Sequence, residues 1–204
     1  MMTRPGSVAV HVWPDSVLLA WTDLRSAHAV TVISVATPET TIRHAARTQI
    51  RVAVRETLAA WLVRPPASIT LISQPGQPIL VDGPDAGIGL SISHAAGLSV
   101  AAIRRGASIG VDVMRYEPSA DPLPDWEVLA RDYLGPQAWR RLATMAPTLR
   151  ASAFAQEWTR WEASLKCLGL AVTEWTPALQ QRLASCRVRA LALPDKYCGA
   201  MATR

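Results

Sequence analysis

The segment 154–170 has the residue spacing of a long amphipathic helix, and this helix limits the folds open to the chain. Its large apolar side chains recur every three or four residues, so they fall on one face of an α-helix. They are Phe154, Trp158, Trp161, Leu165 and Leu168. We predict a helix over residues 151–168 that ends at Gly169, since glycine favours the left-handed conformation that terminates helices. Such a face must be buried against a second layer of structure.

Both halves of the chain also contain short apolar segments bounded by turn-forming residues, which predicts β-strands. These segments are 8–12, 16–22, 29–35, 69–73, 89–93, 98–103, 108–113, 186–193 and 197–201. Further helices are expected over 40–63, capped by Thr40 or Thr41, and over 125–133 and 136–145. The strands 98–103 and 108–113 are expected to form a hairpin around Arg105-Gly106. The mixture predicts an α/β (α+β) fold with two lobes, residues 1–107 and 108–204.

The composition is that of a folded protein that carries excess positive charge. Half of the 204 residues are hydrophobic, and the net charge of +5 suits an anionic partner such as nucleic acid, an acidic protein or a phosphorylated small molecule. A basic surface kept soluble by arginine is the alternative. The three cysteines lack metal-binding spacing, and we expect neither a signal peptide nor an apolar run of the ~18 residues that a membrane span needs. We therefore predict a cytoplasmic protein.

The predicted helix carries a carboxylate and an ammonium one turn apart. Glu162 and Lys166 lie about 40–80° around the helix from Trp158, at the edge of its apolar face. A surface ion pair worth only ~0.3–0.5 kcal/mol is the simplest interpretation of the spacing alone. The alternative is a pair that faces a functional site.

A second acidic residue, Asp112, lies inside the apolar strand segment Gly110-Val111-Asp112-Val113-Met114. A buried carboxylate needs a partner, and a divalent cation is one. Magnesium binds few protein carboxylates and completes its octahedron with water and phosphate oxygens, so Asp112 and Glu162 could form such a site. The alternative is a structural aspartate bonded to backbone amides.

Two further segments contain groups that can bind phosphate. In Ser91-Ile92-Ser93-His94, strand alternation places the two serines on one side and His94 at the strand end. A Ser–His hydrolase is disfavoured because adjacent residues face opposite sides and no G-x-S-x-G elbow is present. The second segment is a row of arginines spaced by four along one helix face, which is either solvated or relieved of its repulsion by a bound anion. These residues are Arg43, Arg47, Arg51 and Arg55.

The ordered set of these segments resembles the Sfp-type 4′-phosphopantetheinyl transferases. That family carries G-K/R-P-x-L, (N/S)-x-S-H, G-(I/V)-D-(I/V)-E and W-x-x-K-E-(A/S)-x-x-K segments in that order. Here they read Gly76-Gln77-Pro78-Ile79-Leu80, Ser91-Ile92-Ser93-His94, Gly110-Val111-Asp112-Val113-Met114, and Trp158-Thr159-Arg160-Trp161-Glu162-Ala163-Ser164-Leu165-Lys166. The segment Ala46-Arg47-Thr48-Gln49-Ile50-Arg51 is similar to the family's A/G-R-x-x-L-R turn. Each motif is weak alone, but four in the right order are specific.

The resemblance implies two similar lobes related by a pseudo-twofold axis, with coenzyme A in the cleft between them. The implied reaction moves the 4′-phosphopantetheine arm of coenzyme A onto a serine of an acyl or peptidyl carrier protein and releases adenosine 3′,5′-bisphosphate. Asp112 and Glu162 would hold Mg²⁺, Glu162 would take the serine proton directly or through a metal-bound water, and Lys166 would steady the phosphates. The implied coenzyme A contacts are Arg43, Arg47, Gln77, Ser93, His94 and Lys166. We expect a monomer, with neither nucleic acid nor membrane as a partner.

Three positions depart from the family pattern. Gln77 replaces a basic residue, Met114 replaces a third carboxylate and Trp161 replaces a lysine. A thioether is a poor magnesium ligand, so water must take the place of the missing carboxylate. The alternatives to an active transferase are a pseudoenzyme that binds coenzyme A without turnover and, from another class, a basic nucleic-acid-binding module.

Overall fold

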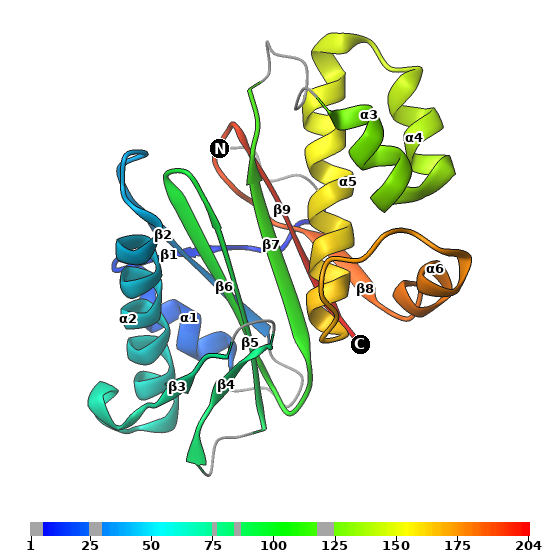
Figure 1. Ribbon diagram of the computed structural model, residues 1–204. Helices are drawn as coiled ribbons and strands as arrows, with labels where there is room; N and C mark the ends of the chain where they lie inside the picture. Colours follow the sequence, from blue (N-terminus) through cyan, green and yellow to red (C-terminus); the bar gives the residue numbers. More distant parts are fainter. Residues whose placement is uncertain (1–5, 25–29, 75–76, 84–86, 118–124) are drawn as a thin grey trace.

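A computed structural model describes residues 6–24, 30–74, 77–83, 87–117 and 125–204. Figure 1 shows two β-sheets packed against each other, with helices on their outer faces. The predicted mixed α+β class is therefore confirmed. In the described part of the chain, none of the helices combines the length and the apolar character that crossing a membrane requires.

The first sheet has the strand order β1-β2-β6-β5-β4-β3, and its neighbours are antiparallel except for the parallel pair β1–β2. Its outer face is covered by α2 (Arg43–Leu62), with α1 (Val17–Asp23) packed beside that helix. The strands are β1 (His11–Val12), β2 (Val30–Ala36), β3 (Leu71–Ile72), β4 (Ile79–Val81), β5 (Ile88–Ala95) and β6 (Leu98–Arg105), and a short 3₁₀ turn, η1 (Pro66–Ser68), precedes β3.

The second sheet has the order β7-β9-β8, all antiparallel. The helix α5 (Pro147–Cys167) lies along its outer face. The strands are β7 (Ile109–Arg115), β8 (Arg187–Ala190) and β9 (Tyr197–Thr203). Around α5 pack the helical segments α3 (Trp126–Leu129), the π-helical η3 (Ala130–Leu134), α4 (Gly135–Ala143) and α6 (Pro177–Leu183).

Strand alternation explains how the two sheets stack. In β6, Ala101 and Ile103 join the core under α2, whereas Val100 and Ala102 join a second core against the other sheet. Val111 and Val113 of β7 enter that second core as well. Both faces of β6 are thus covered, which is why its sequence is almost continuously apolar.

Several predictions of single elements were wrong. The segment 16–22 is mostly the helix α1 rather than a strand, and residue 29 of the predicted strand 29–35 lies outside the described residues. The segments 98–103 and 108–113 do not pair: β6 forms its hairpin with β5, and β7 pairs with β9. The cap of α2 is Ile42, whose side chain makes no capping bond, instead of Thr40 or Thr41.

The change from the first sheet to the second falls between Arg105 and Ile109. The domain boundary at residues 107 and 108 stays a prediction, and so does the pseudo-twofold relation between two similar lobes. The described strands number six in one sheet and three in the other. The N-terminal segment also crosses between the halves, because Val8 forms a parallel bridge with Leu191.

Candidate active site

Asp112 lies where β7 meets α5. Because Val111 and Val113 face the other sheet, alternation turns the Asp112 side chain towards the helix, and the residue is only 5% exposed. Its Oδ1 accepts hydrogen bonds from the Ser93 hydroxyl at 2.7 Å and from the Lys166 ammonium at 2.6 Å. The buried carboxylate therefore has two partners that come from other elements.

The close approach of α5 to β7 depends on Gly110. A Cβ at this position would lie 1.9 Å from the Ala163 carbonyl oxygen and 2.5 Å from the Cys167 amide nitrogen. The helix backbone thus lies directly on the strand where β7 has no side chain. This contact places the last two turns of α5, with Glu162 and Lys166, beside Asp112.

Glu162 is held by side chains from its own helix. Trp158 Nε1 donates to Glu162 Oε1 at 2.9 Å, and Lys166 Nζ lies 3.3 Å from Glu162 Oε2. Trp158 is fixed in turn by ring contacts with Phe154 and Tyr133. The predicted apolar stripe of α5 therefore also orients the carboxylate at its edge.

The two serines of β5 connect the sheets. The amide of Val111 donates to the Ser91 hydroxyl at 3.0 Å, and the amide of Val113 donates to the Ser93 hydroxyl at 3.3 Å. Both hydroxyls lie on one side of the strand, as predicted, and they satisfy amides of β7 where no backbone ladder joins it to β5. His94 bonds to a different partner, the Ser99 hydroxyl at 2.8 Å, so Ser93 and His94 form no hydrolase pair with each other.

Two groups of the site have shifted pKa values. Burial raises the pKa of Asp112 from 3.8 to about 6, and Glu162 adds to the rise while Lys166 and Ser93 oppose it. Burial, followed by the charges of Arg47 and Arg43, lowers the pKa of His94 from 6.5 to about 4. At neutral pH the site therefore holds an ionised Asp112 and an uncharged His94.

One cavity of about 820 Å³ between the two sheets collects the predicted site residues. Its walls include all of them: Arg43, Arg47, Gln77, Ser93, His94, Asp112, Glu162 and Lys166. Gly76 of the first motif lies outside the described residues.

Three of the four arginines in the row of α2 reach this cavity, and the fourth contacts a different part of the fold. Arg43, Arg47 and Arg51 line the cavity, whereas Arg55 donates to the Ile69 carbonyl and does not. Among the described residues, no hydrogen bond or ion pair joins the first three to an acidic group. The cavity thus has a wall of uncompensated positive charge, which suits a polyanion.

The opposite wall fits a magnesium ion. Asp112 and Glu162 present two carboxylates that share one cation, Lys166, and hard carboxylate oxygens are the protein ligands that magnesium prefers. The described residues contain no group of three His, Cys, Asp or Glu side chains arranged for a metal. Met114, at the place of the family's third carboxylate, packs in the apolar cluster around Phe154. Waters and ligand phosphates would supply the remaining positions.

Trp161 contributes no charge to this cavity. Its ring is 7% exposed and meets the rings of Tyr133 and Trp158 edge-on or tilted, on the side of α5 that packs against α6. The indole that replaces the family's lysine is thus a core residue.

Sequence reasoning missed three residues that position the site. Trp158 was assigned only to the core, although its indole bonds to Glu162, and the i, i+4 spacing of an indole and a carboxylate could have indicated this. Ser91 was not connected to β7, and Gly110 was not recognised as the contact with α5. These two contacts join residues far apart in sequence, so no local pattern reports them.

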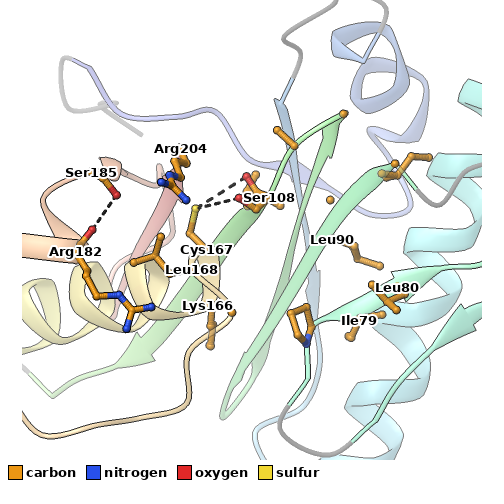
Figure 2. A pocket seen from close by; sticks show the side chains of 18 residues that line it. Ile79, Leu80, Leu90, Ser108, Lys166, Cys167, Leu168, Arg182, Ser185 and Arg204 are labelled. Carbon is orange, nitrogen blue, oxygen red and sulfur yellow. Dashed lines mark hydrogen bonds between the residues drawn. The ribbon is translucent and has the colours of Figure 1, made fainter. Parts of the chain in front are cut away.

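Two further cavities adjoin the first one. A mainly apolar cavity of about 370 Å³ shares Ile79, Glu162 and Lys166 with it. Figure 2 shows the next one, of about 710 Å³, with Lys166 and Ile79 again on its walls and Arg182 and Arg204 on the side of the C-terminal strand. Lys166 therefore borders all three cavities.

Comparison with known families agrees with this geometry. Residues 108–193 match the family model described as the 4′-phosphopantetheinyl transferase superfamily. The matched region contains Asp112, Glu162 and Lys166, and it begins after the arginine row and His94. The match does not distinguish the Sfp-type class within the superfamily. No curated protein is significantly similar to the chain. The part of the chain that carries both carboxylates and the lysine of the site, residues 108–193, is therefore similar to the 4′-phosphopantetheinyl transferase superfamily domain.

Proposed function

We propose that this protein transfers the 4′-phosphopantetheine arm of coenzyme A to a serine of an acyl or peptidyl carrier protein, with Mg²⁺ as cofactor. The observation that carries the proposal is the pairing of two walls in one cavity. Asp112 and Glu162 share Lys166 on one wall, and Arg43 and Arg47, which pair with no acidic group in the described part of the chain, stand on the other. Coenzyme A is a polyanion with a pyrophosphate, so it matches an arginine wall and a cation site together.

The proposed reaction is a phosphoryl-type transfer. The serine Oγ forms a bond to the phosphorus that bears the pantetheine arm, and the bond from this phosphorus to the bridging pyrophosphate oxygen breaks. Adenosine 3′,5′-bisphosphate leaves with the electron pair of that bond, and the serine proton passes to Glu162. The magnesium ion would neutralise pyrophosphate charge and make the phosphorus more electrophilic.

The chain's own residues would position and polarise the reactants. Trp158 fixes the Glu162 carboxylate in one orientation, which favours proton transfer from a serine delivered to it. Lys166 would stabilise the charge on the departing phosphate oxygens. His94, uncharged because of its lowered pKa, would bind a phosphate as a hydrogen-bond donor rather than as a cation.

The test is transfer to a purified apo carrier protein, followed by intact-protein mass spectrometry with coenzyme A and Mg²⁺. A panel of fatty-acid, polyketide and peptide-synthase carriers should include one that gains the phosphopantetheine mass. Glu162→Gln should lower the rate by about 10²–10⁴-fold, the usual contribution of a general base. Glu157→Gln is the matched control, because Glu157 lies on the same helix and pairs with Arg141 outside the cavity.

The same experiment tests the alternative of a pseudoenzyme, which Met114 favours because it removes the third carboxylate. Coenzyme A binding without transfer to any carrier would establish that alternative. Absence of coenzyme A binding would refute both. Salt-sensitive DNA or RNA binding in its place would favour the nucleic-acid module. A cytoplasmic location and a monomeric state remain predictions, which cell fractionation and light scattering test.

A further inference from the structure

The ammonium of Lys166 lies between the two carboxylates that would hold a metal ion. Its Nζ is 2.6 Å from Asp112 Oδ1 and 3.3 Å from Glu162 Oε2, and it also donates to the Val111 carbonyl at 3.2 Å. Asp112 and Glu162 come from different elements, and this ammonium is the cation that joins them. A divalent cation bound by both carboxylates would need the same space.

An ammonium and a metal ion cannot share this position. Both are cations, and like charges a few ångströms apart in a partly buried site repel strongly. The Asp112 side chain is only 7% exposed, so water screens the repulsion poorly. Metal binding to the free protein must therefore first break the contacts of Lys166.

Lys166 has both space and a reason to move. Its side chain is 31% exposed, and it borders the two adjoining cavities as well as the main one (Figure 2). In the free protein, the acceptors nearest to its ammonium are the ones it already contacts. A phosphate group brought into the cavity by the arginine wall would offer the ammonium an alternative anionic partner.

We propose that Lys166 occupies the metal position of the free protein and that phosphates of coenzyme A draw its ammonium away, so the metal binds with coenzyme A or after it. The inference rests on the proposed function, since it takes coenzyme A as the anion. It makes metal binding conditional on the substrate. The free protein would hold metal weakly, and coenzyme A would strengthen metal binding through two effects, its own phosphate oxygens and the release of both carboxylates from Lys166.

The test measures Mn²⁺, a spectroscopic substitute for Mg²⁺, by electron paramagnetic resonance at pH 8 with no coenzyme A present. Lys166→Met should bind Mn²⁺ at least about tenfold more tightly than the wild-type protein, because charged hydrogen bonds that oppose the metal are gone. Lys196→Met is the matched control: the only other lysine is exposed and remote from the cavity, and its loss should change nothing. Lys166→Gln, with circular dichroism, guards against misfolding of the first variant.

Two results would overturn the inference. One is equal Mn²⁺ affinity in the wild-type protein and both Lys166 variants. The other is a gain in affinity that persists in the double variant Asp112→Asn/Lys166→Met, because the metal would then lie elsewhere. Coenzyme A binding and transfer are measured separately, so failure of the proposed function can be told apart from failure of this inference. A protein that does not bind coenzyme A refutes the proposed function. The Mn²⁺ affinities of the free protein test the position of Lys166 independently of that result.

Discussion

Gly110→Ala tests whether the site depends on direct contact between β7 and α5. The added Cβ would lie 1.9 Å from the Ala163 carbonyl oxygen, and an ordinary contact needs about 3.4 Å, so the helix must retreat by about 1.5 Å. Overpacking of this kind costs about 1–3 kcal/mol. For a chain of this length that lowers the melting temperature by roughly 3–10 °C.

The same displacement should also lower the rate of phosphopantetheine transfer. It would lengthen the 2.6 Å contact between Lys166 and Asp112 to about 4 Å, beyond hydrogen-bonding distance. A shift of about 1 Å in a catalytic group can cost about 10²-fold in rate, so we expect at least that loss of transfer.

The assay compares thermal unfolding and carrier modification in Gly110→Ala and in a control, Gly87→Ala. Gly87 is exposed, has an ordinary φ, and a Cβ there meets no atom within 4 Å, so the control should behave as the wild-type protein does. If Gly110→Ala is as stable and as active as Gly87→Ala, the contact between β7 and α5 does not position the site.

The two shifted pKa values give predictions of opposite sign for stability. Because the pKa of His94 falls from 6.5 to about 4 on folding, the unfolded chain binds a proton first as the pH drops, and stability is lost between pH 6.5 and 4. His94→Gln should reduce that loss by about 1–2 kcal/mol, after allowance for the half-exposed ring, as measured by urea unfolding at pH 7.5 and 5. The pKa of Asp112 instead rises from 3.8 to about 6, so ionisation costs stability as the pH rises through that window. Asp112→Asn keeps an acceptor for Ser93, and its free energy of unfolding at pH 7.5 should exceed that of the wild-type protein by about 1–2 kcal/mol, while transfer is lost. A less stable variant at pH 7.5, or an advantage that persists at pH 4, would contradict this account.

The elements that the sequence predicts well are those with a long, regular pattern. The helix predicted over 151–168 is α5 (Pro147–Cys167), because five large side chains repeat on one face of it. The segment 16–22 is too short and too evenly apolar for its period to separate helix from strand, and it is α1. The predicted hairpin failed for a different reason: β7 has the alternation of a strand whichever partner it takes, and its partner β9 is some eighty residues further along the chain.

The candidate site shows the same division between local pattern and tertiary contact. The order of motifs located Asp112, Glu162 and Lys166, and the structure brings all three to one cavity. The order of motifs does not predict which contacts orient these three side chains. The bond from Trp158 to Glu162 depends on indole orientation, and the serine bonds to β7 depend on how two sheets lie together. Such contacts are set by packing across the fold rather than by neighbours in sequence.

The distribution of charge argues that the cavity is built for a ligand and not for stability. On one wall a nearly buried carboxylate has a raised pKa, which means that its ionised form is disfavoured by the fold. On the other, Arg43, Arg47 and Arg51 repel one another along α2, and their charges add to the burial that lowers the pKa of His94. The arginines of α2 do not contact the carboxylates of the other wall. Only Lys166 pairs with Asp112 and Glu162 among the described residues. A fold selected for stability alone would replace such groups with apolar ones. Within the described residues, a positive wall with no acidic partner faces two carboxylates that share a single ammonium, and this arrangement favours a ligand that carries phosphate and cation together.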